Sequence, residues 1–207
     1  MSYFNITTEG LTMPNTDLAI RSATRSPNTI KYFIATDDFK TSLVEYVPAN
    51  FLDWQIETIL NFTNKIQETF NLKFERVFDF SQADLPFIAT NLVGKASLSW
   101  WGDIRHFYEG AYLEMSVGMG LNMDDKGIYI GEFTDGHKAE WKKVFLHELG
   151  HVLGLEHPWD MKNGDLDSDA PDSTSLISPT IMGYVNPNSH WDEWYEPIDI
   201  YALTNIW

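Results

Sequence analysis

Residues 147–158 read His-Glu-Leu-Gly-His-Val-Leu-Gly-Leu-Glu-His-Pro, and this stretch contains three of the six histidines of the chain. His147 and His151 are four positions apart, so on a helix they lie one turn apart on the same face. Both imidazoles can then bind one metal ion. Gly154 permits the positive φ at which a helix ends, and the following turn can return His157 as a third nitrogen ligand. Three protein ligands and an open fourth position are typical of a catalytic zinc site.

Glu148 stands beside two of these histidines. It follows His147 and precedes His151 by three residues, which puts a carboxylate next to the metal without making it a ligand. A general base must stand there to take a proton from water that the metal activates. The competing interpretations are an amphipathic helix with incidental histidines and a zinc site that only stabilises the fold. The number of fixed positions in the extended pattern favours the catalytic site over both.

The pattern His-Glu-x-x-His-x-x-Gly-x-x-His resembles the zinc signature of the metzincin endopeptidases. Pro158, directly after the third histidine, is similar to the serralysin branch of that clan. By this resemblance residues 178–184 form the methionine turn, in which Met182 lies beneath the metal. Tyr184 resembles the tyrosine whose hydroxyl hydrogen-bonds the tetrahedral intermediate. Without the zinc motif, the same two residues would be interpreted as a core methionine and a surface tyrosine.

The resemblance implies an α+β fold of the metzincin type: a twisted, mostly parallel sheet, an active-site helix and an irregular C-terminal subdomain. Residues 1–28 are expected to form an N-terminal arm or a short pro-segment. Residues 29–207 are expected to form the catalytic domain, with an N-terminal subdomain to about residue 154 and a C-terminal subdomain over 155–207.

A zinc-dependent endopeptidase that acts on polypeptide substrates is the function that the resemblance implies. One alternative is a metzincin-like binding or structural module whose zinc does no chemistry. Another is a protease restricted to itself or to one assembly partner. The presence of Glu148 argues against the first alternative, because a non-catalytic zinc site needs no base there.

Hydrophobic periodicity predicts the elements around the motif. A strand is predicted over 29–35, and a helix from Pro48-Ala49-Asn50, with Asn50 as its cap, to about residue 70. A strand–helix–strand order predicts parallel pairing. In metzincins a strand at the cleft pairs with substrate, and by resemblance it falls within 110–133. The remaining expectations are strands over 72–80, 83–88, 111–117 and 127–133, helices over 138–153 and 197–206, and loops over 94–109 and 158–179.

Composition excludes several classes of partner. The 207 residues contain 30 acidic and 14 basic side chains, a formal net charge of −16, which repels nucleic acid. No long apolar run occurs, so no membrane span is predicted. Cysteine is absent, which leaves histidine and carboxylate as metal ligands. A monomer is expected, since nothing in the sequence points to an obligate oligomer.

The acidic loop after the zinc motif has a weaker signal for a second metal. Asp165-x-Asp167-x-Asp169 begins like a calcium-binding EF-hand, but Ala170 and Leu176 stand where that loop requires Gly and Glu. A solvated acidic loop is the favoured interpretation, and a calcium site of another kind is the alternative. Several other residues are interpreted as structural rather than functional: His106, His137, His190, Trp191 and Trp194.

The N-terminus lacks the basic and apolar regions of a conventional signal peptide. The Gly-Gly-x-Gly-x-Asp calcium repeats of serralysins are also absent from these residues. Because serralysins use that repeat domain for export, the resemblance supplies no export route. An extracellular or exported protein without a signal peptide is expected, and carriage inside a virion or a secreted assembly is one alternative. A stand-alone protease and a fragment of a larger chain both remain open.

Overall fold

The structure is a computed structural model, and it describes residues 8, 11–12, 28–36, 47–91, 102–107, 110–116, 122–123, 129–158, 179–183 and 194–207. Several sequence predictions lie outside the described residues: the acidic loop over 159–178, Tyr184, His190 and Trp191.

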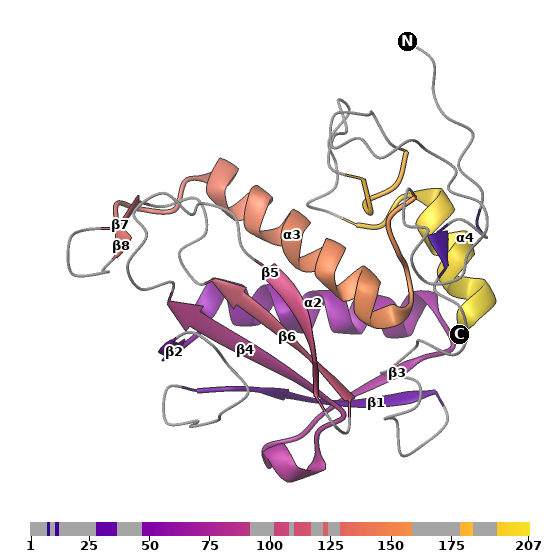
Figure 1. Cartoon of the computed structure of the whole chain (residues 1–207), viewed down its shortest axis with the longest axis horizontal. Helices are drawn as coiled ribbons and strands as arrows, with labels where there is room; N and C mark the ends of the chain where they lie inside the picture. The colour runs from indigo at the N-terminus through magenta and orange to yellow at the C-terminus, as the bar shows by residue number, and fades with distance from the viewer. Residues whose placement is uncertain are drawn as a thin grey trace.

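A six-stranded mixed sheet forms the centre of the fold (Figure 1). Its order is β3-β1-β4-β6-β5, and β2 pairs with β4 outside this path. Four strands run parallel: β1 (Thr29–Ile34), β3 (Lys73–Arg76), β4 (Leu85–Asn91) and β6 (Gly110–Ser116). Two are antiparallel to their neighbours: β2 (Val47–Ala49) and β5 (Gly102–Phe107). The predicted parallel pairing of β1 with β3 is confirmed.

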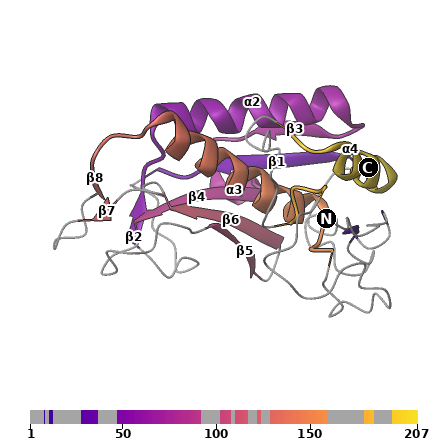
Figure 2. The ribbon, with the colours of Figure 1, turned by 90° about the horizontal axis from the view of Figure 1, so that it is seen from above.

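Two long helices, α2 (Asp53–Thr69) and α3 (Asp135–Leu153), lie side by side against the sheet (Figures 1 and 2). Phe145 of α3 stacks on Phe62 of α2 with ring centroids 6.1 Å apart. Its ring also lies 5.6 Å from that of Phe87 in β4. All three rings are buried, so this aromatic layer fixes α3 on both α2 and the sheet. Helices packed on a mostly parallel sheet make an α+β fold, as expected.

Two predictions about the β5 end of the sheet are wrong. Residues 94–109 are predicted to be a loop, whereas 102–107 form β5 and pair with β6 along their whole length. β5 also ends the strand order, so the edge strand next to α3 lies before 110–133 rather than within it. The sequence Gly-Asp-Ile-Arg-His-Phe carries a weak strand signal, and pairing with a neighbour overrides local propensity. The predicted strand over 127–133 is short: β8 (Tyr129–Ile130), which pairs with β7 (Asn122–Met123).

The predicted start of the first long helix is also wrong. Asn50 does not cap it, because α2 begins at Asp53 and residues 47–49 pair with β4 as β2. This pairing joins segments about 40 positions apart, which no local pattern encodes. The N–H of Leu52 donates instead to the side-chain oxygen of Gln55 at 2.9 Å, and this bond satisfies one donor at the helix start.

The predicted strands over 72–80 and 83–88 have different ends in the structure. β3 stops at Arg76, before a short 3₁₀ helix, η2 (Phe80–Gln82). β4 continues to Asn91 because it pairs with β6 and β2 as well as with β1.

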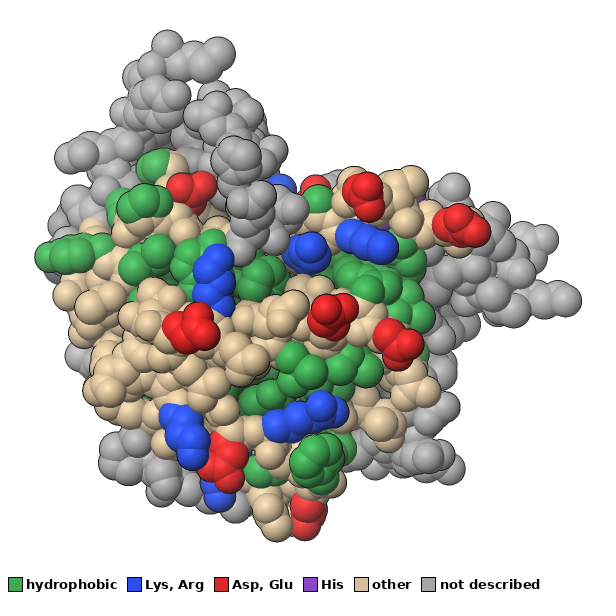
Figure 3. All heavy atoms as spheres, turned by 180° about the vertical axis from the view of Figure 1, so that it is seen from behind, with side chains coloured by type: hydrophobic (Ala, Val, Ile, Leu, Met, Phe, Trp, Pro, Cys, Tyr) green, Lys and Arg blue, Asp and Glu red, His purple; other side chains and the backbone are tan. Residues whose placement is uncertain are grey.

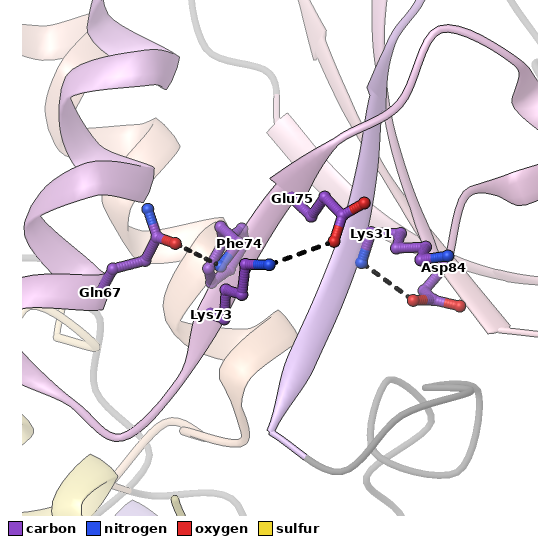
Figure 4. Close-up of polar contacts among 6 residues, drawn as sticks. All are labelled: Lys31, Gln67, Lys73, Phe74, Glu75 and Asp84. Carbon is purple, nitrogen blue, oxygen red and sulfur yellow. Dashed lines mark hydrogen bonds and ion pairs between the residues drawn. The ribbon is translucent and has the colours of Figure 1, made fainter.

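Near the β3 edge of the sheet, polar contacts connect β1 to the start of β4 and β3 to α2 (Figure 4). The Lys31 N–H donates to a carboxylate oxygen of Asp84 at 2.9 Å, and the Asp84 N–H donates to the Lys31 carbonyl at 2.7 Å. The pair fixes the start of β4 on β1. The Phe74 N–H donates to Gln67 of α2 at 3.0 Å. The exposed Lys73–Glu75 ion pair, at 3.3 Å, contributes little to stability.

The face opposite that of Figure 1 carries acidic and basic side chains interspersed with one another (Figure 3). The acidic excess of the chain is therefore not concentrated on that face. Within the described parts of the chain, each helix is too short or too polar to cross a membrane.

Candidate metal centre

Both ends of α3 are fixed by local chemistry. Thr134 caps its start: the Thr134 hydroxyl accepts from the His137 N–H at 3.2 Å, and His137 Nδ1 accepts from the Thr134 N–H at 3.3 Å. The helix therefore begins at Asp135, three residues before its predicted start. His137 is a structural residue, as predicted. At the other end Gly154 has a φ of 109°, which confirms the predicted left-handed turn.

The three histidines of the motif come together beyond this turn. The candidate ligand atoms of His147, His151 and His157 all lie within 4.8 Å of one another. The Nε2 atoms of His147 and His157 are 3.2 Å apart. Two nitrogens of a tetrahedral zinc site, each about 2.0–2.1 Å from the ion, are about 3.3 Å apart. The group could hold a metal ion.

Backbone carbonyls determine which nitrogens face inward. His147 Nδ1 lies 2.9 Å from the Ile181 carbonyl oxygen, and His151 Nδ1 lies 2.8 Å from that of Leu155. A carbonyl oxygen only accepts, so each Nδ1 carries the proton and each Nε2 keeps a lone pair. Two inward lone pairs on oriented imidazoles fit a cation, and carbonyl partners of this kind are common around metal-bound histidines.

Burial keeps these imidazoles neutral. Burial, the largest cause, and the nearby His157 and Lys143 together lower the pKa of His147 to about 4, against the opposite effect of the hydrogen bond to the Ile181 carbonyl. Burial also lowers the pKa of His151 well below its ordinary value, with the other two histidines adding to the effect. Because a metal binds only the unprotonated ring, His147 and His151 are ready for a cation at neutral pH without losing a proton.

We expect the metal-free protein to lose stability as the pH falls from about 6.5 to about 4. In the unfolded chain His147 has its ordinary pKa of 6.5 and binds a proton in this window. In the folded chain it stays neutral until the pH nears 4, so protonation favours the unfolded state. The full shift corresponds to about 3 kcal/mol. Urea unfolding with a chelator present, at pH 7 and pH 4, measures it.

The control for this pH effect is His147→Gln. The variant loses the contribution of His147 and, because His147 also lowers the pKa of His151, part of the contribution of His151, so its stability loss should be at least about 3 kcal/mol smaller. Equal losses in the two proteins would contradict the assignment to His147.

A buried carboxylate organises the turn over 179–183, which supplies the carbonyl for His147. Asp199 lies in the first turn of α4 (Pro197–Ile206), where a helix was predicted. It accepts hydrogen bonds from the Thr180 hydroxyl, the Ile181 N–H at 3.0 Å and the Glu196 N–H at 3.0 Å. Burial raises the pKa of Asp199 to about 6, against the opposite effect of these bonds. The Asp199 carboxylate thus holds the Ile181 N–H directly. It also holds the Thr180 hydroxyl, which accepts from the Met182 N–H at 3.1 Å and so fixes the peptide unit whose carbonyl orients His147.

Met182 is fully buried and lies against α3. A Cβ added to Gly150 would be 2.8 Å from the Met182 sulfur and 3.5 Å from both Leu155 and Tyr195. The glycine in the motif therefore allows the 179–183 turn to approach the helix between the two ligand-bearing positions. The Tyr195 hydroxyl donates to the Leu146 carbonyl at 3.1 Å and also holds this part of α3.

Gly150→Ala is expected to destabilise the protein by about 1–3 kcal/mol, because the added methyl overpacks the contact with Met182. Denaturant unfolding measures the loss. Gly136→Ala is the matched control on the same helix, since its Cβ would meet only Thr134 at 3.7 Å. In Gly136→Ala the higher helix propensity of alanine should leave stability equal or raised. Equal behaviour of the two variants would show that the Met182 contact is not restrictive.

The other predicted residues are placed as follows. Glu148 lies on α3, next to His147, with a partly exposed side chain. Trp194 packs on Phe62 with ring centroids 6.3 Å apart and lies 4.4 Å from the Lys65 ammonium, which supports its structural interpretation. His106 falls in β5, and its side chain lies outside what the structure describes.

Asp199 was missed as a functional residue. Its only signal in the sequence is an acidic side chain between two isoleucines at the start of a helix.

Comparisons with known proteins assign no family. No family model matches the chain, and no curated protein matches it. Among solved structures it is similar to the GM1-bound form of the ECX AB5 holotoxin, with 15% sequence identity and a TM-score of 0.46. The match covers 87% of this chain and 80% of the other. Similarity at this level assigns neither a family nor a function.

Proposed function

We propose that the chain is a zinc-dependent endopeptidase of the metzincin type. The observation that supports this most is the convergence of three imidazoles, two of which are oriented by backbone carbonyls so that Nε2 faces inward. An all-nitrogen set suits zinc, whereas calcium prefers oxygen ligands. Glu148, adjacent to His147 on α3, adds the carboxylate that a purely structural site does not need.

In the proposed hydrolysis, the three histidines, Glu148, Tyr184 and Met182 have separate roles. His147, His151 and His157 would hold the ion, and the ion would act as a Lewis acid that acidifies water and polarises the scissile carbonyl. Glu148 takes a proton from the attacking water and delivers it to the leaving amine. Tyr184 is proposed to donate a hydrogen bond to the developing oxyanion. Met182 supports the ligands from beneath and does no chemistry.

An extended polypeptide is the proposed substrate. β5 is the outer strand of the sheet and packs against α3, the helix that carries Glu148 and two of the histidines. A substrate strand that pairs with an outer strand is bound through its backbone. This arrangement selects for extended chain and favours unfolded or flexible segments over folded ones.

Metal content and casein cleavage test the proposal together. Elemental mass spectrometry should find one zinc per chain, and the protein should cleave casein, lose the activity to a chelator and regain it with added zinc. Absence of zinc binding would contradict the proposal. Zinc binding without cleavage of casein would favour a structural module or a protease restricted to itself or one partner.

A further inference from the structure

The N-terminal segment Leu11–Thr12 lies against the loop that leads to the third histidine (Figure 1, indigo, near the α4 label). Thr12 forms an antiparallel bridge with Leu155, and the Leu11 carbonyl accepts from the Glu156 N–H at 2.9 Å. The Leu11 side chain is fully buried in the main hydrophobic core. A segment about 145 positions away in sequence is thus anchored at the metal centre.

His157 depends on this loop in a way that the other two ligands do not. His147 and His151 are held by α3, but His157 follows the turn at Gly154 and has no helix of its own. On one side, the Leu155 N–H donates to the Gly150 carbonyl at 2.9 Å, and the Leu155 carbonyl accepts from His151 at 2.8 Å.

On the other side, the loop contacts Leu11 and Thr12. Glu156, the residue that they hold, directly precedes His157. Ordering a loop ligand before the ion arrives removes an entropic cost from binding.

We infer that Leu11 and Thr12 are positioning residues of the metal centre, which hold His157 in place and raise metal affinity chiefly through that ligand. The inference rests on the proposed zinc site. It makes this part of the N-terminal arm a permanent element of the site rather than a removable pro-segment.

A double-mutant cycle on the full chain tests this coupling. Leu11→Ala is made alone and in a His157→Ala background, and zinc affinity is measured by competition with a chelating dye. With His157 present, Leu11→Ala should weaken zinc binding about tenfold, as losses of outer contacts at metal sites do. With His157 absent, the same change should alter affinity by less than about twofold, because the ligand it positions is gone.

Leu72→Ala is the matched control. It removes the same atoms from a buried position next to β3, at the sheet edge opposite to β5, and should leave zinc affinity within about twofold. If Leu11→Ala does not fold by circular dichroism, Leu11→Val in both backgrounds gives the same comparison with a smaller cavity.

Equal losses with and without His157 would overturn the inference, since Leu11 would then support the fold in general. Unchanged zinc affinity with increased casein cleavage would also overturn it and identify the arm as inhibitory. The readout is zinc binding, so a wild-type protein that binds zinc but cleaves nothing would defeat the proposed protease and leave this test intact. A wild type that binds no zinc would defeat both.

Discussion

Glu148→Gln is expected to reduce peptide hydrolysis by about 10²- to 10⁴-fold while zinc stays bound at one ion per chain. The amide has nearly the shape of the carboxylate but cannot accept the proton of the attacking water. The ligands are untouched, because all three candidate ligand residues are histidines. Initial rates on casein, with zinc content measured on the same samples, separate the loss of the base from the loss of the metal.

Glu140→Gln is the control for this experiment, since it makes the same substitution on the same helix. Glu140 forms an ion pair with Lys143 at 3.4 Å and is partly exposed. Its replacement should leave the cleavage rate unchanged within about twofold, as surface changes away from a site do. A Glu148→Gln variant that keeps wild-type activity would rule out Glu148 as the general base.

Asp199→Ala is expected to lower the free energy of unfolding by about 3–5 kcal/mol and to weaken zinc binding as well. The change leaves three buried donors without their acceptor: the Thr180 hydroxyl and the N–H groups of Ile181 and Glu196. Thr180, whose hydroxyl accepts from the Met182 N–H, would lose its anchor, and the Ile181–Met182 peptide unit, whose carbonyl orients His147, would then be free to turn. Urea unfolding measures the first effect and competition with a chelating dye the second.

Asp53→Ala is the matched control for Asp199. Both residues lie in the first turn of a helix, but Asp53 is exposed and Asp199 is fully buried. Asp53→Ala should cost only about 0.3–1 kcal/mol, through the lost interaction with the helix dipole, and should not change zinc affinity. If Asp199→Ala lowered stability and left zinc affinity unchanged, the carboxylate would support the fold without positioning His147.

Much of the candidate metal centre could be predicted from the sequence because its determinants are local. The four-residue spacing of His147 and His151 becomes a shared helix face as soon as α3 forms. Gly154 adopts the predicted left-handed conformation and ends that helix. The closing helix predicted over 197–206 has its predicted bounds, and its proline at the first turn is a common helix start.

Local pattern failed where pairing decides the structure. Residues 102–107 carry too few β-formers to predict a strand, yet they become the edge strand through hydrogen bonds to β6. Residues 47–49 have a proline and an asparagine nearby, which resemble a helix start, but pairing with β4 makes them a strand. In both cases the deciding partner is another segment, and its contribution appears in no window of the sequence.

The sequence by itself thus determined the chemistry of the candidate site: three imidazoles, a neighbouring carboxylate, and a helix and turn that bring them together. Only the tertiary structure decided how the ligands are held. The carbonyl of Ile181, the buried carboxylate of Asp199 and the segment Leu11–Thr12 each reach the site from a distant part of the chain. Helical spacing follows from bonds between residues a few positions apart. Contacts between distant segments depend instead on the packing of the whole core, which no short sequence pattern encodes.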